Sequence, residues 1–419
     1  MRNTVILFAC LAACSLAADL KFAPGGGATM STDDQIATFE KWAKGDPNNA
    51  QNCTLLAAAY IQKTRETADP GYLERADALI QRVMARQPRH YEAWRLRNLV
   101  ELNRHHFSTV ADYAGKLTVW APRDPQNWGT LGDALMELGR YPEAAEAYGK
   151  MAAIKESLFS LNRQAYYRFV TGDSEGALEA MRKAVQAGAL YPENKAWCLA
   201  ELGSMNFKLG RLDEAERAYR DAIDAFPGLH QAHAGLGAVL AARGRTNEAI
   251  ASYTRAQSIV PLPQYSGALA DLFAGADKIE KARKQNAQID MIAALEEAAG
   301  QKANRTLALV YANQERNLEK AQALADADLE LRKDIYTWDA MYWVLYKRGR
   351  LEDARKASRE ALKTGAREPL LLYHAGMIER AAGDREAGRK LLESALALNP
   401  RFDRVQAGLA RQALAEAGN

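Results

Sequence analysis

The residue pair in this sequence best suited to chemistry is formed by two histidines. His230 and His233 are spaced i, i+3, which would place both imidazoles on one side of a helix, where they could bind a metal ion. A stable site needs further ligands, and the sequence offers no third ligand nearby. We therefore interpret His233 as a packing residue and predict neither a metal nor a cofactor.

Motifs that carry catalysis are missing from the sequence. It contains no Gly-rich phosphate loop followed by Lys and Ser or Thr, no nucleophile elbow and no His-Glu-x-x-His segment. The acidic residues that come nearest to a titratable cluster are Asp271, Asp277 and Asp290, and they have basic neighbours. We predict that the protein is not an enzyme, and the alternative is a catalytic site assembled from residues 264–301.

Composition and charge exclude several classes of protein. Apolar residues make up 48% of the 419 residues and charged residues 26%, which is ordinary for a folded protein. The 55 basic and 52 acidic residues are mixed along the chain and leave a net charge of only +3. Because polyphosphate binding needs a concentrated positive field, we predict that nucleic acid is not a partner.

The N-terminal residues are typical of an export signal. Arg2 is the only charge before an apolar run at residues 5–13, which is too short to span a bilayer. Residues 11–14 (LAAC) resemble the lipobox of bacterial lipoproteins, in which the cysteine, here Cys14, receives a diacylglyceride. We favour this interpretation because a Gly-rich stretch that could act as a flexible tether follows.

Ordinary signal-peptide cleavage near Ala18 is the alternative to lipidation. Either way, residues 1–18 form the predicted signal peptide and residues 19–33 a flexible tether. The predicted location is the periplasm or the outer membrane, with secretion as the alternative. Contact with a membrane is expected only through the N-terminal lipid, and the oligomeric state stays open.

Two cysteines, Cys53 and Cys198, remain after the signal segment. The repeats described next place them about four repeats apart, which is too far for a disulfide in a repeat array. We interpret both as small buried apolar residues.

Small and turn residues recur with a period close to 34 residues over most of the chain, between helix-length segments rich in Ala, Leu, Glu, Arg and Lys. Glycines that leave room for a crossing helix are Gly132, Gly203, Gly237 and Gly376. Glycines that end a helix follow seven residues later, at Gly139, Gly210, Gly244 and Gly383. Alanines that open the next helix are Ala144, Ala215, Ala249, Ala321 and Ala354. These columns predict a series of helix pairs.

The columns resemble the tetratricopeptide repeat family. One unit carries Trp128, Leu131, Gly132, Gly139, Ala144 and Tyr148, and another carries Leu202, Gly203, Gly210, Ala215, Tyr219, Ala222 and Pro227. The predicted units are 91–124, 125–157, 158–195, 196–229, 230–263, 302–334, 335–368 and 369–402, with degenerate units at 48–90 and 264–301. In this register His233 takes the place of Trp128.

The resemblance implies an all-α, right-handed superhelical solenoid of about ten helix-turn-helix repeats. We predict an N-terminal array at 34–263, a degenerate repeat at 264–301, a C-terminal array at 302–402 and a capping helix at 403–419. First helices would line the concave side. The family's Lys and Asn pattern for holding a C-terminal carboxylate is not reproduced, because Arg95 with Leu99 and Gly129 with Asp133 stand in its place.

Aromatic and polar residues of the first helices are the predicted partner-binding groove, since aromatic and arginine side chains are common anchors of interfaces. The predicted groove residues are Arg95, Phe159, Asn162, Tyr166, Phe169, Trp197, Phe207, Tyr336, Asp339, Trp343, Tyr346 and Tyr373. The expected function is a protein-protein interaction scaffold of the cell envelope that binds a protein or peptide. The alternatives are packing roles for these aromatics and an exported protein that binds a small molecule or glycan.

Overall fold

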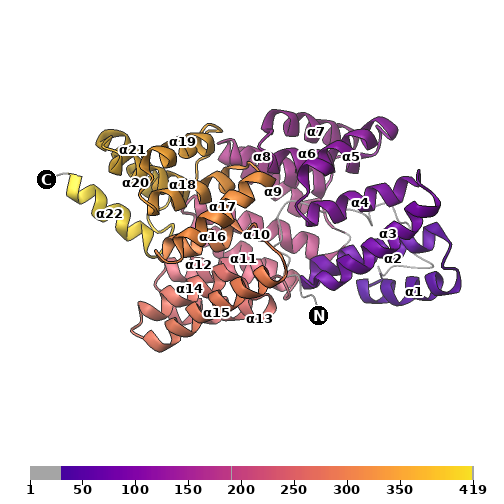
Figure 1. Cartoon of the computed structure of the whole chain (residues 1–419), viewed down its shortest axis with the longest axis horizontal. Helices are drawn as coiled ribbons and strands as arrows, with labels where there is room; N and C mark the ends of the chain where they lie inside the picture. The colour runs from indigo at the N-terminus through magenta and orange to yellow at the C-terminus, as the bar shows by residue number, and fades with distance from the viewer. Residues whose placement is uncertain (1–29, 190, 418–419) are drawn as a thin grey trace. The chain divides into compact units, whose positions relative to one another are not determined.

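The computed structural model describes residues 30–189 and 191–417, whose regular secondary structure is entirely helical. Within these residues there are 22 α-helices and no β-strand (Figure 1). The predicted signal peptide and residues 19–29 of the predicted tether lie outside the described residues, and α1 begins at Thr32. None of the helices in the described part combines the length and apolar composition needed to span a bilayer.

The helices fall into two compact units. Unit 1 comprises residues 1–163 and 186–194, and unit 2 comprises residues 164–185 and 195–419. Helices of unit 1 are α1 (Thr32–Gly45), α2 (Ala50–Thr67), α3 (Pro70–Arg86), α4 (Tyr91–Asn103), α5 (Phe107–Trp120), α6 (Pro125–Glu137) and α7 (Tyr141–Ile154). Three helices have residues in both units, α8 (Leu158–Val170), α9 (Ser174–Gln186) and α10 (Pro192–Lys208).

Unit 2 contains the remaining helices. They are α11 (Leu212–Ala225), α12 (His230–Ala242), α13 (Thr246–Ile259), α14 (Pro263–Ala274), α15 (Ile279–Ala298), α16 (Arg305–Asn313), α17 (Leu318–Leu331), α18 (Ile335–Lys347), α19 (Leu351–Leu362), α20 (Pro369–Ala381), α21 (Arg385–Leu398) and α22 (Gln406–Ala417). From α2 to α21, each even-numbered helix is the first of a pair and the following odd-numbered helix is the second. The predicted all-helical solenoid of paired helices is confirmed.

Local sequence explains where the helices begin and end. At the start of α6, the Asp124 carboxylate accepts a hydrogen bond of 2.8 Å from the Gln126 amide, and Pro125 occupies the first turn. At the turn after α6, Gly139 has a φ of +70°, a left-handed conformation that favours glycine. These signals define the predicted helix-turn-helix unit.

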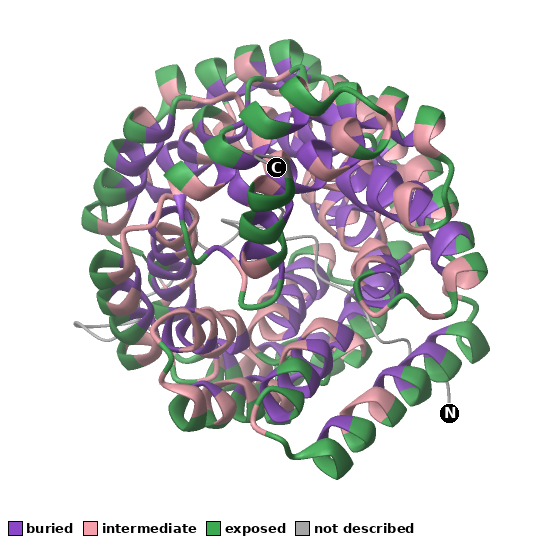
Figure 2. Ribbon diagram, turned by 90° about the vertical axis from the view of Figure 1, so that its left-hand side faces the viewer, coloured by how far each residue is buried: buried purple, intermediate pink, exposed green. Residues whose placement is uncertain are grey.

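The two helices of a pair cross where a glycine of the first meets a tyrosine of the second. A Cβ atom on Gly132 would lie 2.3 Å from the Tyr148 ring, and one on Gly203 would lie 2.9 Å from the Tyr219 ring. No side chain fits at such distances, so the backbone of the first helix approaches the ring directly. Each pair buries the faces that its helices turn toward each other and exposes the outer faces (Figure 2).

The C-terminal segment forms a single helix, α22, in the region predicted as a cap. Its Ala407 and Ala410 are buried, whereas Val405, just before the helix, and Leu409 are more than 40% exposed. The predicted domain boundaries at residues 263, 301 and 402 stay predictions, since the compact units divide near residues 163 and 195 instead.

Candidate functional site

The predicted groove residues divide evenly into buried and half-buried side chains. The six that are buried are Phe159, Asn162, Phe169, Asp339, Trp343 and Tyr373. The six that are half-buried are Arg95, Tyr166, Trp197, Phe207, Tyr336 and Tyr346. Only the second set offers surface to a partner in this conformation, and the binding role of all twelve stays a prediction.

A polar network explains why two of the predicted residues, Asp339 and Trp343, are buried. His374, which is fully buried, lies 2.8 Å from Asp339 and stacks on the Trp343 ring with 3.9 Å between ring centroids. Gln406 of α22 lies 3.1 Å from the other His374 nitrogen and donates to the Asn313 side chain at 2.9 Å. The network joins α16, α18, α20 and α22, so these groups serve the interior of unit 2.

A pocket of about 250 Å³ lies between α18, α20, the start of α21 and α22. Its lining residues are Tyr346, Met377, Arg380, Ala381, Arg385 and Glu416. Arg380 forms an ion pair of 2.9 Å with Glu416, whereas Arg385 is exposed and has no ion pair among the described residues. The Tyr346 ring stacks on Trp343, which fixes its orientation. The pocket therefore offers an oriented aromatic ring, a flexible thioether and two guanidinium groups to an incoming chain.

A larger open groove, of about 440 Å³, lies on α6 between the second helices α5 and α7. Its floor is apolar and consists of Trp128, Leu131, Leu135 and Leu138. Charged residues of both signs form the rim, and the Lys150 ammonium lies 4.3 Å from the Trp128 ring centroid. This groove was not predicted from the sequence, because Trp128 and Leu131 were interpreted only as signature residues of the repeat.

The end of α10 carries a lysine in an unusual environment. The Lys208 ammonium forms an ion pair of 2.9 Å with Glu368 and donates a hydrogen bond of 3.1 Å to the Tyr336 hydroxyl. It also lies 4.9 Å from the Tyr336 ring centroid and 5.5 Å from that of Phe169. Glu201 lies about two helical turns before Lys208 on α10. Burial raises the pKa of Glu201 to about 7, whereas the Lys208 charge acts to lower this pKa.

A buried ion pair connects α6 to α8 in unit 1. Arg163 contacts both carboxylate oxygens of Asp133, at 2.7 and 2.8 Å, and the Tyr148 hydroxyl donates to the same carboxylate at 3.0 Å. The side chains of Arg163 and Asp133 are 3% and 1% exposed. The partially exposed Arg95 is also paired, with Glu92 at 2.8 Å and Asp124 at 3.3 Å. Charges on these first helices are therefore mostly matched within the chain.

The histidines and cysteines have structural partners. His230 is buried with its Nδ1 atom 2.7 Å from the Tyr265 hydroxyl, and burial lowers its pKa to about 4. The His233 Nε2 atom lies 3.0 Å from the Pro227 carbonyl. The Cys53 and Cys198 side chains are both buried, and neither forms a disulfide within the described residues. Within residues 30–189 and 191–417, no group of three or more His, Cys, Asp or Glu side chains could hold a metal ion.

Several solved structures are similar to the chain. The Pseudomonas aeruginosa protein PilF is 15% identical, with a TM-score of 0.42 over 48% of this chain and 91% of its own. A tetratricopeptide repeat protein from Parabacteroides merdae is 16% identical, with a TM-score of 0.34 over 62% of this chain and 99% of its own. Yeast Tom70 is 14% identical, with a TM-score of 0.38 over 92% of each chain.

The family assignment rests on the repeats themselves. The tetratricopeptide repeat family matches residues 104–158, 130–194, 162–228 and 201–267. No curated protein matches the sequence significantly. On both sides of the matched region the chain continues in helix pairs of the same construction. Residues 104–267 therefore match the tetratricopeptide repeat family.

Proposed function

We propose that this protein is a non-enzymatic adaptor of the cell envelope that holds a partner protein or peptide against the first helices of its repeats. Tetratricopeptide repeats form protein-interaction scaffolds, and this chain is built from them. We choose the first-helix side as the binding surface because of the pocket at Tyr346.

The pocket at Tyr346 has the side chains that anchor protein interfaces. Aromatic and arginine residues dominate the binding energy of most interfaces, and here Tyr346, Arg380 and Arg385 lie together. The ring orientation is fixed by stacking, so little conformational entropy is lost on binding. The two arginines outnumber the one acidic side chain of the pocket, Glu416, which favours a partner segment with a carboxylate beside an apolar residue.

Truncating the pocket should weaken binding without unfolding the protein. We expect the Tyr346→Ala, Arg385→Ala double variant to bind the partner about tenfold or more weakly, because it removes an aromatic anchor and a free guanidinium. Lys356→Ala, which changes an exposed residue on the second helix α19, is the matched control. Affinity capture from the native host, with bound proteins quantified by mass spectrometry, measures the change. Equal capture by both variants would rule out this pocket.

The location in the envelope rests on Cys14, which lies outside the described residues. Cys14→Ala should release the protein from the membrane fraction into the soluble fraction, since no acyl chains could then be attached. Cell fractionation with immunodetection of the full-length chain measures the distribution. If wild type and variant are both soluble, the lipoprotein part of the proposal is wrong and ordinary cleavage near Ala18 replaces it.

A further inference from the structure

Segments of unit 2 that are far apart in the sequence touch along one line. On one side are the ends of first helices and their turns, at Gly172, Lys208, Gly210, Ala242 and Gly275. On the other side are residues 365–368 and 398–404. We call this line of contacts the seam. All of its residues belong to unit 2.

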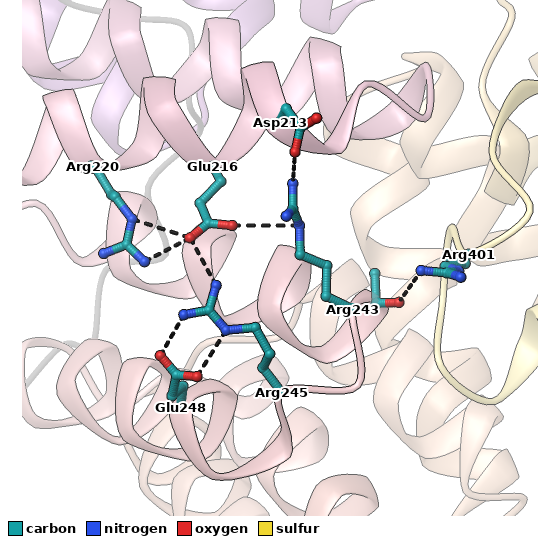
Figure 3. Close-up of polar contacts among 8 residues, drawn as sticks. Asp213, Glu216, Arg220, Arg243, Arg245, Glu248 and Arg401 are labelled. Carbon is teal, nitrogen blue, oxygen red and sulfur yellow. Dashed lines mark hydrogen bonds and ion pairs between the residues drawn. The ribbon is translucent and has the colours of Figure 1, made fainter.

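The seam is made largely of backbone contacts. The Asn399 side chain donates a hydrogen bond of 2.6 Å to the Phe207 carbonyl at the end of α10. Arg401 reaches the Ala242 carbonyl at the end of α12, at 3.4 Å, beside the cluster of paired charges around Glu216 (Figure 3). Donors are well placed there, because the last carbonyls of a helix lack partners within the helix.

Two glycines allow the backbones on either side of the seam to meet. A Cβ atom on Gly172 would lie 2.5 Å from the Gly365 carbonyl oxygen, and one on Gly210 would lie 2.6 Å from the Leu398 carbonyl oxygen. Such distances are too short for any side chain, so an alanine at either position would have to displace the opposite segment. The contact therefore depends on glycine for space as well as for its positive φ.

Lys208 holds the seam at its most charged point. Its ammonium contacts Glu368 and Tyr336, which belong to or precede helices far along the chain, and it also faces the Phe169 ring. Glu368 is 6% exposed, and its second carboxylate oxygen is buried without a hydrogen-bond partner. Breaking this pair would rehydrate both groups, which lowers the cost of opening the seam.

Apolar packing is arranged on each side of the seam. One cluster of buried residues runs from Ala196 to Leu272 and another from Ile289 to Ala413, and they are separate clusters among the described residues. A contact made of a few polar groups and backbone atoms opens at much lower free energy than a core. The seam is thus the place where unit 2 can open while its helix pairs stay intact.

We propose that the seam is a clasp that opens and closes the solenoid turn of unit 2 and thereby controls access of the partner to the pocket at Tyr346. We call this control of access the gate. The gate rests on the proposed function, whereas the clasp itself does not. With the clasp closed, residues 365–368 and 398–404 fix the curvature of the array. With it open, neighbouring repeats change their spacing and a partner segment gains room to enter.

Two glycines in adjacent repeats provide a matched test. Gly210 and Gly244 occupy the same turn position and both have a φ of +74°, so alanine strains the backbone equally at both. A Cβ atom on Gly210 collides with Leu398, whereas one on Gly244 meets nothing within 4 Å. We expect Gly210→Ala, but not Gly244→Ala, to increase hydrogen exchange of residues 396–404 about tenfold. Glu368→Gln, which weakens the hold on Lys208, should act in the same direction.

Photo-crosslinking from a reactive residue at position 346, in the same full-length variants, tests the gate. Gly210→Ala should raise the yield of crosslinked partner severalfold over Gly244→Ala, because a larger fraction of molecules is open. Equal exchange in the two alanine variants would overturn the clasp. Raised exchange with an unchanged crosslink yield would overturn the gate and leave the seam structural. If no variant crosslinks any partner, the proposed function fails and the gate with it, while the exchange result still decides the clasp.

Discussion

Asp133→Ala is expected to lower the local unfolding free energy of α6 to α8 by about 3–5 kcal/mol, because it removes the carboxylate that the buried Arg163 guanidinium contacts with two of its nitrogens. The pair is bidentate, almost completely buried and shares the Tyr148 hydroxyl. A buried guanidinium that loses these contacts cannot replace them by hydration. The loss should exceed that of any exposed ion pair in the chain.

Hydrogen exchange of the α6 and α7 amides measures the effect, since a long repeat array need not unfold in one step. Glu143→Ala is the control: it breaks the Arg140–Glu143 pair, whose side chains are 49% and 53% exposed, and should cost less than about 1 kcal/mol. A result in which both variants lose the same stability would show that Arg163 reaches solvent.

Trp343→Ala is expected to destabilise unit 2 by about 3–5 kcal/mol, as is typical when a buried tryptophan is removed from a core. Trp343 is 2% exposed, stacks on His374 and donates a hydrogen bond of 2.7 Å to Asn313. Its removal would leave a cavity and would take away one of the two hydrogen bonds that the Asn313 oxygen accepts, the other coming from Gln406. The variant should therefore loosen α22 as well as α18.

Trp197→Ala is the companion to the Trp343 experiment, because Trp197 is half-buried on the first helix α10. Thermal unfolding followed by circular dichroism should show a clearly larger loss for Trp343→Ala than for Trp197→Ala. A small effect of Trp343→Ala would mean that its ring serves binding rather than packing, as the sequence alone left open.

The sequence was sufficient to predict the helix pairs because a repeat places its signature residues at fixed spacing. Its glycines at 132 and 203 do meet the tyrosines of the second helix. The degenerate segment 264–301 has the same turn, although it lacks the glycine found there in other repeats. Asp277 has a φ of +56° and so adopts the left-handed conformation of the turn glycines. The repeat spacing could locate that turn only approximately, because an aspartate, unlike a glycine, does not by itself indicate a left-handed turn.

The sequence could not separate groove aromatics from core aromatics, because both lie on first helices. Trp343 is covered by His374 of the next first helix and by the network that includes Gln406 of α22. Tyr346, three residues later, keeps part of its ring at the surface. The difference depends on which side chains the neighbouring repeats supply, and a 34-residue period does not contain that information.

Long-range charge pairing was likewise invisible in the sequence. Asp133 and Arg163 are 30 residues apart, and Lys208 and Glu368 are much farther apart in the chain. Only the superhelical stacking of repeats brings them together, and the seam arises from the same stacking.

The central claim is that a partner binds to the first-helix side of unit 2. A photo-reactive residue introduced singly at Tyr346, at Lys356 on α19, and at Trp128 in the groove of unit 1 tests it most directly, in living cells with the full-length chain. We expect a specific protein to be crosslinked from position 346 and not from positions 356 or 128. Crosslinks from position 128 or 356 with none from position 346 would contradict it.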